Sequence, residues 1–151
     1  MNNDQKTLYE SDFYSWTKQQ AQLIKERRFD ELDLDNLAEE VEDMGKHEPR
    51  SLTSHLMQLL MHLLKWQYQP ERRSRSWRDS IILQRAKAKD VLDENPGLKP
   101  RKAELYKKAY KKAVVLAARQ TELPLETFPS ECPWTYEAVM HDDFLPENPP
   151  H

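Results

Sequence analysis

Glycine is almost absent from this chain. Only Gly45 and Gly97 occur among its 151 residues, whereas proline occurs ten times. Tight hairpins and phosphate-cradling loops need glycine, while helices tolerate proline as a boundary residue. The scarcity of glycine therefore disfavours hairpin folds and glycine-rich nucleotide-binding loops, and it favours an all-α protein.

Cysteine is scarcer still, because Cys132 is the only one. A single cysteine excludes an internal disulfide and any zinc site built from several cysteines. No apolar run is long enough to cross a bilayer, and no charged segment followed by an apolar stretch opens the chain. These absences predict a cytoplasmic protein that does not insert into a membrane.

The most hydrophobic segment covers residues 51–68 and lies between Pro49 and Pro70. Its leucines recur at the spacing that places apolar groups on a wide face of an α-helix: positions 52, 56, 59, 60, 63 and 64. A helix that is apolar around most of its circumference belongs inside a domain, so we expect it to be the central helix. The predicted core consists of six residues: Leu56, Leu59, Leu60, Leu63, Val41 and Leu116.

Two amphipathic helices are predicted before the central one. Residues 7–28 carry apolar side chains at helical spacing, and Thr7 or Ser11 stands where an N-cap is expected. A short second helix begins near Asp33 or Asp35 and ends at Gly45, whose position suits a left-handed C-cap. The sequence therefore predicts a helix boundary between Gly45 and the central helix.

Two more helices and an irregular strap are predicted after the central helix. Residues 76–94 and 100–120 show apolar stripes, and Ser76 is the predicted N-cap of the first of these helices. Residues 121–151 are rich in proline and aromatic residues. We expect this last segment to be a strap with one short helix near 134–141.

The length of the chain bounds its organisation. A chain of 151 residues fits one domain. We expect residues 1–151 to form a compact single-domain bundle of about five main helices, with the irregular strap at its C-terminus. The ends, 1–6 and 147–151, are expected to fray.

Several strings in the chain resemble a known family. They are LYESDFYSW, LDLDNLAEEVEDMG, LMHLLKWQYQP, RSRSW, FPSECPW and FLP, in this order. Together they resemble the bacterial family called domain of unknown function twenty-nine, which is known chiefly from cyanobacteria and some proteobacteria. The resemblance spans essentially the whole chain. It implies a compact all-helical protein, and it supplies neither an activity nor a catalytic residue.

A metal site is the first candidate chemistry. The residues that could form it are His62 on the central helix and three acids on the helix before it: Glu39, Glu40 and Asp43. His55 is seven residues from His62, or about 10 Å along a helix, so the two cannot share one ion. The Glu-x-x-His pairs of di-iron bundles are missing, and His62 also fits the ordinary polar stripe of a core helix. We therefore expect no metal and no cofactor.

Nucleophilic catalysis would have to use Cys132. A catalytic thiol needs a base or positive surroundings, and the sequence neighbour Glu131 supplies negative charge instead. The alternative is a buried or half-buried cysteine that behaves as a small hydrophobe. The sequence favours that alternative.

Charge is distributed unevenly along the chain. Residues 65–112 contain fifteen Lys or Arg and six acids, whereas the segments before and after are acidic. Inside this basic block, Trp77 stands among four arginines: Arg72, Arg73, Arg75 and Arg78. Aromatic rings interleaved with guanidinium groups are typical of single-strand binders, and a helix N-terminus nearby would favour the same phosphate. The competing hypothesis is that the acidic flanks fold against the block and neutralise it.

These observations leave three classes of function. The leading hypothesis is a binding or interaction module without a catalytic site, which engages a protein partner or nucleic acid through residues 65–112. Its nucleic-acid form is weak binding of RNA or single strands by the arginines. The second class is a mononuclear metal-dependent enzyme that uses His62 and the acids at 39–43, and the third is a structural or oligomerising bundle. The sequence leaves the oligomeric state open.

Overall fold

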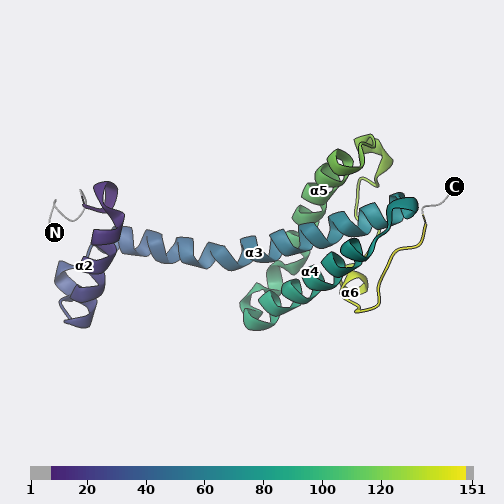
Figure 1. The fold of residues 1–151 in the computed structure, drawn as a ribbon. Coiled ribbons are helices and arrows are strands. Elements are labelled where there is room, and N and C mark those ends of the chain that lie inside the picture. The colour runs from purple at the N-terminus through teal and green to yellow at the C-terminus, as the bar shows by residue number, and fades with distance from the viewer. Residues whose placement is uncertain (1–7, 149–151) are drawn as a thin grey trace. The chain divides into compact units, whose positions relative to one another are not determined.

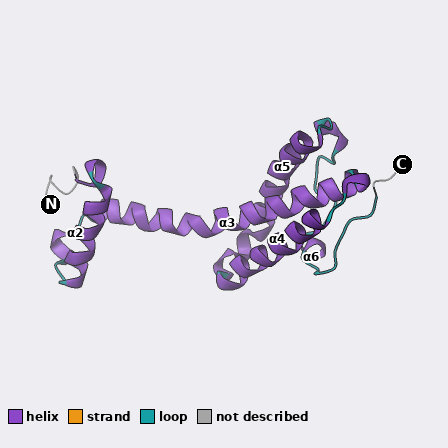
Figure 2. Cartoon of the chain, viewed as in Figure 1, coloured by secondary structure: helices purple, strands orange, loops and turns teal. Residues whose placement is uncertain are grey.

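The computed structural model describes residues 8–148, which form helices joined by loops and contain no strand (Figure 1). The α-helices are α2 (Phe13–Lys25), α3 (Leu34–Tyr68), α4 (Arg75–Glu94), α5 (Lys102–Thr121) and α6 (Tyr136–Val139). Short 3₁₀ helices occur at Phe29–Glu31, Pro70–Arg72, Pro96–Arg101 and Leu125–Thr127. Figure 2 shows the same alternation of helix and loop. The predicted all-α class is confirmed, and none of the helices within residues 8–148 is long and apolar enough to cross a membrane.

Contacts divide the chain into two compact units, Met1–His47 and Glu48–His151. The boundary falls within α3. Such a division does not decide how many parts fold independently, so the single-domain interpretation stays a prediction. The predicted fraying of 1–6 lies outside the described residues, as do 149–151.

In the first unit, α2 begins at Phe13, one residue later than a cap at Ser11 would place its start. Residues 8–11 form a separate helical turn, and the N-cap of α2 is Asp12, whose carboxylate accepts a hydrogen bond from the backbone N–H of Ser15 at 3.1 Å. The prediction of Ser11 as the cap is therefore wrong, and Thr7 lies outside the described residues. A carboxylate satisfies an unpaired helix N–H as well as a hydroxyl does, which explains the difference.

The first unit is organised around the buried carboxylate of Asp33. The Trp16 indole donates to Asp33 Oδ2 at 3.0 Å, and the Asp33 N–H donates to the buried Gln20 side chain at 2.9 Å. The Asp33 carbonyl then accepts the N–H of Leu37 at 2.9 Å, at the start of α3. Trp16 and Asp33 are almost fully buried. This network joins α2 to the first turn of α3.

Helix α3 passes through the predicted boundary without a break. Gly45 does not adopt a left-handed conformation, and Pro49 lies inside the helix. Pro49 lacks the N–H that would bond to the carbonyl of Gly45, four residues earlier. The predicted C-cap at Gly45 and the predicted helix boundary before the central helix are therefore wrong. The helix continues because it loses only one internal hydrogen bond, at a position where Gly45 is exposed and its surroundings are open.

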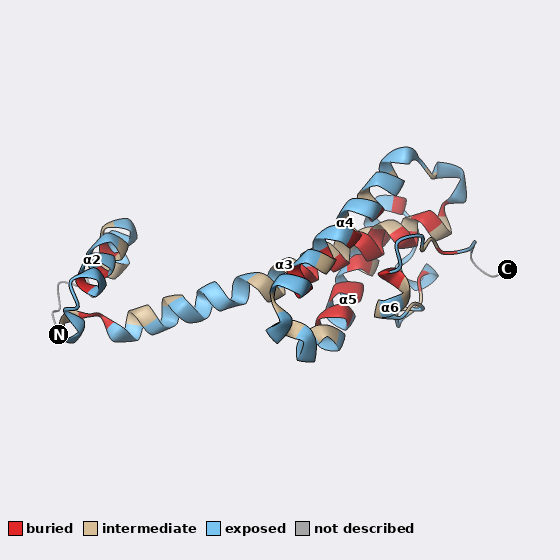
Figure 3. Ribbon diagram, turned by 90° about the horizontal axis from the view of Figure 1, so that it is seen from below, coloured by how far each residue is buried: buried red, intermediate tan, exposed pale blue. Residues whose placement is uncertain are grey.

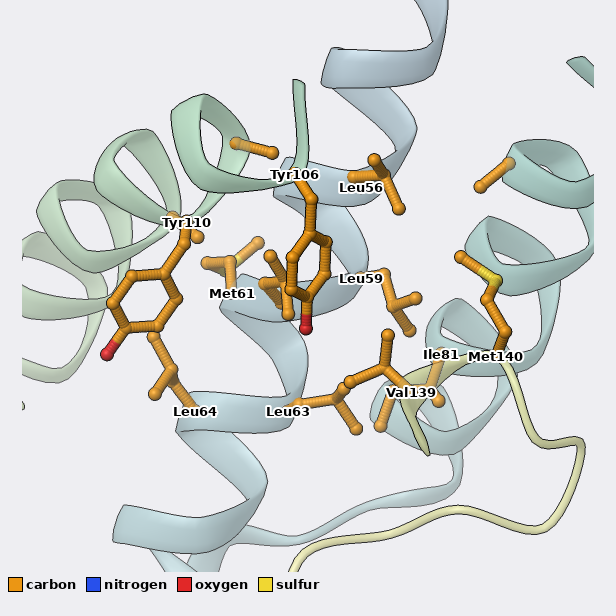
Figure 4. Close-up of a cluster of buried hydrophobic side chains, with 14 of the residues drawn as sticks. Leu56, Leu59, Met61, Leu63, Leu64, Ile81, Tyr106, Tyr110, Val139 and Met140 are labelled. Carbon is orange, nitrogen blue, oxygen red and sulfur yellow. The ribbon is translucent and has the colours of Figure 1, made fainter. Parts of the chain in front are cut away.

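The hydrophobic core of the second unit is built on the second half of α3. Leu52, Leu56, Leu59, Leu60, Leu63 and Leu64 are fully buried. Figure 4 shows side chains from α3, α4, α5 and α6 meeting there, among them Ile81, Tyr106 and Val139. Leu116, which was predicted in the core, is half-buried and packs against the core from its edge. The prediction for Val41 is wrong, because this residue is 63% exposed. Figure 3 shows the first half of α3 mostly in the colour of exposed residues.

The C-terminal segment is irregular apart from its short helices, as predicted. It is held by Arg85 of α4, whose side chain is 3% exposed. The guanidinium donates from Nε to the carbonyl of Val139 at 2.8 Å and from its two terminal nitrogens to the carbonyls of Asp142 and Phe144, each at 2.7 Å. Burial lowers the pKa of Arg85 from its ordinary value, but a guanidinium remains charged at any physiological pH. One buried cation thus fixes three backbone carbonyls.

Candidate functional site

The predicted arginines lie between the end of α3 and the first turn of α4. Arg72, Arg75 and Arg78 are exposed, whereas Arg73 is half-buried. Within residues 8–148, none of these four arginines forms an ion pair with an acid. The described structure therefore leaves the positive charge of this segment without a carboxylate partner.

Arg73 differs from the other three because its side chain holds the fold together. Its Nε donates to the carbonyl of Trp66 at 2.7 Å, and a terminal nitrogen donates to Asn148 Oδ1 at 2.7 Å. Its guanidinium also lies 5.0 Å from the centre of the Trp66 ring. Arg73 joins the end of α3 to the C-terminal segment, so two of its five N–H donors are already used within the chain.

The tryptophans of the basic block contact cations of their own chain. Lys65 Nζ lies 4.6 Å from the centre of the Trp77 ring, and the guanidinium of Arg78 lies 5.6 Å from the centre of the Trp66 ring. Trp66 is also 8% exposed. A base that stacked on these rings would have to displace a cation–π contact. The predicted alternation of aromatic rings and arginines is present, but both tryptophan rings already contact cations of the same chain.

The start of α4 also differs from the prediction in detail. Ser74, not Ser76, is the N-cap, and its hydroxyl accepts the backbone N–H of Trp77 at 3.2 Å. Ser74 and Ser76 were equally suitable residue types, and the extended backbone at Ser74 decides between them. One donor of this helix N-terminus is therefore already occupied.

The candidate metal ligands are not gathered into a site. Within residues 8–148, no group of three or more His, Cys, Asp or Glu side chains could hold a metal ion. The Nδ1–H of His62 donates to the carbonyl of Gln58 at 2.8 Å, and Glu40 accepts the hydroxyl of Tyr9. Asp43 pairs with Lys46 at 3.3 Å, and Glu39 is exposed. His62 belongs to the second unit and the three acids to the first.

Cys132 is a half-buried residue with a neutral environment. Its sulfur lies 3.3 Å from the hydroxyl of Tyr106, and burial raises the pKa of the Cys132 thiol. The same hydroxyl donates to the carbonyl of Trp134 at 2.8 Å, and burial also raises the pKa of Tyr106. A raised pKa disfavours the thiolate that a nucleophile needs. Cys132 therefore serves to pack the C-terminal segment against α5.

A concave surface lies beside α5. Two cavities of about 290 and 320 Å³ share Tyr110, Lys111 and Ser130, and together they form a groove between α5 and residues 125–134. We call this surface the α5 groove. Its lining is mostly apolar or aromatic: Tyr106, Tyr110, Val114, Val115, Leu125, Phe128, Pro129 and Trp134.

Helical spacing explains the wall that α5 contributes to this groove. Tyr106, Tyr110 and Val114 stand four residues apart, and so they line one side of the helix. Lys107 and Lys111 follow the same spacing one position further around, at the edge of the groove. Both lysines are exposed, and neither forms an ion pair within residues 8–148.

The opposite wall of the groove comes from the segment that follows α5. Tyr110 donates its hydroxyl to the carbonyl of Pro129 at 2.6 Å, and the Phe128 ring packs edge-on against Tyr68 at 5.0 Å. Glu126 and Glu131 also line this wall. The groove thus has an apolar floor, a basic edge on α5 and an acidic edge opposite. Sequence reasoning missed it, because one wall depends on irregular backbone.

The fold and these surfaces define an all-α protein with a partly apolar groove, in which no group of three or more His, Cys, Asp or Glu within residues 8–148 could hold a metal ion. The chain belongs to the family described as Domain of unknown function DUF29, whose model matches residues 8–145. This match confirms the resemblance seen in the sequence. No curated protein and no solved structure matches the chain.

Proposed function

We propose that this protein is a protein-interaction module and that its α5 groove binds an acidic, amphipathic segment of a partner. The observation that supports this proposal is the α5 groove. Ligand sites are typically concave and apolar, with a few polar groups that fix orientation. The α5 groove has this composition, and no catalytic group lines it in a reactive state.

The charges at the two edges indicate how a partner would be oriented. Lys107 and Lys111 supply two cations on the α5 side that have no ion-pair partner in the described chain. Glu126 and Glu131 repel acids from the other side. A bound segment would place its apolar side chains on the exposed Val115 and Leu125 and its carboxylates toward α5. Such complementarity fixes orientation and association rate more than affinity.

A designed peptide pair tests this proposal. The probe is a fluorescein-labelled 16-residue helix with leucines on one face and glutamates on the other, and its counterpart has lysines in place of the glutamates; about 16 residues span roughly 24 Å. We expect saturable binding of the acidic peptide by fluorescence anisotropy, with little binding of the basic one. Binding should weaken as salt rises, because exposed charges are screened.

Two matched pairs of variants on α5 distinguish binding in the groove from non-specific attraction to the basic surface of the helix. Lys107→Glu with Lys111→Glu reverses the edge of the groove, whereas Lys108→Glu with Lys112→Glu makes the same charge change on residues that do not line it. The first pair should weaken binding by about tenfold or more, since a like charge opposite a ligand costs over 1 kcal/mol. Equal losses in both pairs, or no binding of the acidic peptide, would refute the proposal.

A second candidate, weak binding of a polyanion, is favoured by the exposed arginines around the start of α4. Arg72, Arg75 and Arg78 have no ion-pair partner in the described residues, and they lie within seven residues of one another. Because Trp66 and Trp77 already contact cations, the expected contacts are to phosphate rather than to stacked bases. Phosphate contacts supply affinity without sequence preference.

Titration with labelled single-stranded RNA tests this second candidate. Affinity should fall as salt rises, with a log–log slope of about −0.7 per phosphate contact. Inorganic polyphosphate should compete as well as RNA does. The variant with Arg72, Arg75 and Arg78 changed to Ala should lose binding while staying folded, and Arg73 is left intact because it holds the structure. Binding that persists in this variant would refute the assignment.

A further inference from the structure

The first half of α3 presents an apolar face that the other residues of the first unit leave exposed. Leu34, Val41 and Met44 are 62%, 63% and 71% exposed, and Leu37 between them is half-buried. These residues are as apolar as those of the buried half of the same helix. Large apolar side chains that cluster on one exposed face mark an interaction surface more often than single ones do. We call these four residues the α3 seam.

The spacing of the α3 seam is that of a coiled coil. Its members are separated by three, four and three residues, which is the a and d pattern of two heptads. At a rise of about 1.5 Å per residue, residues 34–47 provide about 21 Å of helix. A helix with this pattern packs best against another helix that carries the same pattern.

Two small residues lie next to the α3 seam. Ala38 and Gly45 are seven residues apart and follow Leu37 and Met44 directly. Gly45 is not needed for backbone conformation, because it lies inside a helix and its φ is not positive. A Cβ built on it would meet no atom within 4 Å. A glycine in a helix that has no conformational need for it leaves room for the close approach of another helix.

We infer that the α3 seam pairs with the same seam of a second copy, so that the protein forms a symmetric homodimer. The charge layout favours this occupant. The exposed acids Asp35, Glu39, Glu42 and Asp43 lie on the side of the helix turned away from the α3 seam. Two copies therefore meet along the seam without bringing their acids together, which a self-complementary interface requires.

The remaining acid near the α3 seam is already engaged. Glu40 accepts the hydroxyl of Tyr9, and this bond raises the pKa of Tyr9 to about 12. A two-heptad seam is small compared with the roughly 1,200–2,000 Å² that stable interfaces bury. The dimer should therefore dissociate on dilution.

Sedimentation velocity over a protein concentration of about 1–200 µM tests the dimer, a range in which a small interface dissociates. We expect a reversible monomer–dimer equilibrium. The variant Val41→Glu with Met44→Glu should be monomeric throughout, because it places carboxylates in the seam. Circular dichroism checks that the variant keeps its helix content, which is expected because both residues are exposed.

The control variant is Leu83→Glu, which makes a similar change at a residue of α4 that is 50% exposed. It should dimerise like the unmodified protein. A protein that stays monomeric at all concentrations would overturn the inference, and so would a dimer that survives the seam variant. Equal loss of the dimer in the control would also overturn it.

Salt distinguishes seam pairing from electrostatic association of two copies. Apolar pairing should persist or strengthen when the NaCl concentration rises from about 0.1 to 1 M, where the screening length falls from about 10 to 3 Å. Dissociation of the dimer by salt would mean that the acidic side meets a basic surface. That result would overturn the inference. None of these outcomes depends on whether the α5 groove binds a peptide.

Discussion

The two halves of α3 share one helix and one kind of apolar spacing, yet they differ completely in burial. Leu56, Leu60 and Leu63 in the second half are fully buried, whereas Leu34, Val41 and Met44 in the first half are more than 60% exposed. Helical periodicity shows which side chains share a face. It does not show whether the same chain covers that face. The second half is the core of a unit, and the first half is the surface through which we propose association.

The largest expected effect is the difference in stability loss between a substitution in the second half of α3 and one in the first half. Leu60→Ala should lower the free energy of unfolding by about 2–5 kcal/mol, because it removes buried methyl groups and leaves a cavity. Val41→Ala should change it by less than about 0.5 kcal/mol, since the side chain is exposed. Urea unfolding of dilute protein measures both. Similar losses at the two positions would contradict the assigned burial.

A substitution of Arg85 tests how the C-terminal segment is held over the core that the second half of α3 forms. Arg85→Met should lower the free energy of unfolding by about 2–3 kcal/mol, because it leaves buried carbonyls without a donor. Limited proteolysis should then cut within residues 139–146. The control is Lys89→Met, which removes an exposed ion pair to Asp142 in the same segment and should cost at most about 1 kcal/mol. Resistance to proteolysis in Arg85→Met would contradict this account.

A substitution of Gly45, in the first half of α3, should have a smaller effect on stability and should increase it. Gly45→Ala should raise the stability of dilute, monomeric protein by about 0.5–1 kcal/mol, because alanine loses less backbone entropy in a helix. The new methyl group meets no atom within 4 Å. Thermal unfolding followed by circular dichroism measures the change. Destabilisation would show that a part of the same chain lies against Gly45.

The smallest effect is a pH dependence confined to the buried half. Burial lowers the pKa of His62 below its ordinary value of 6.5, and Lys65 lowers it further. The unfolded state therefore binds more protons, so this contribution to stability is complete above about pH 6.5 and decreases as pH falls toward the pKa of the folded state. His62→Gln should flatten the pH dependence of urea unfolding between about pH 5 and 7. His47→Gln, an exposed change in the first half, is the control and should keep it.

The sequence predicted the helices well where local signals and burial agree. The predicted helices near 76–94, 100–120 and 134–141 correspond to α4, α5 and α6, because apolar stripes mark their extent, although the predicted cap Ser76 lies inside α4. It predicted a break at Gly45 that does not exist. Glycine and proline change the local cost of a helix, but a helix anchored at both ends tolerates one missing hydrogen bond.

The candidate surfaces were predictable only in part. The exposed arginines could be recognised from composition, yet nothing in the sequence separates Arg73, which bonds to the Trp66 carbonyl, from Arg72. The α5 side of the groove follows from spacing, whereas the facing wall depends on how residues 125–134 turn. Backbone carbonyls are the partners in both cases, and they carry no sequence signature.

The way in which Arg85 holds the C-terminal segment bears on how the protein can change by mutation. All three acceptors are main-chain oxygens, and every residue type offers a carbonyl. Substitutions at the exposed Asp142 and Asp143 can therefore accumulate without loss of the attachment. Replacement of Arg85 cannot be compensated by one exchange in the segment, since no single side chain reproduces three donors in a fixed fork. The C-terminal segment therefore tolerates substitutions at this contact, whereas Arg85 does not.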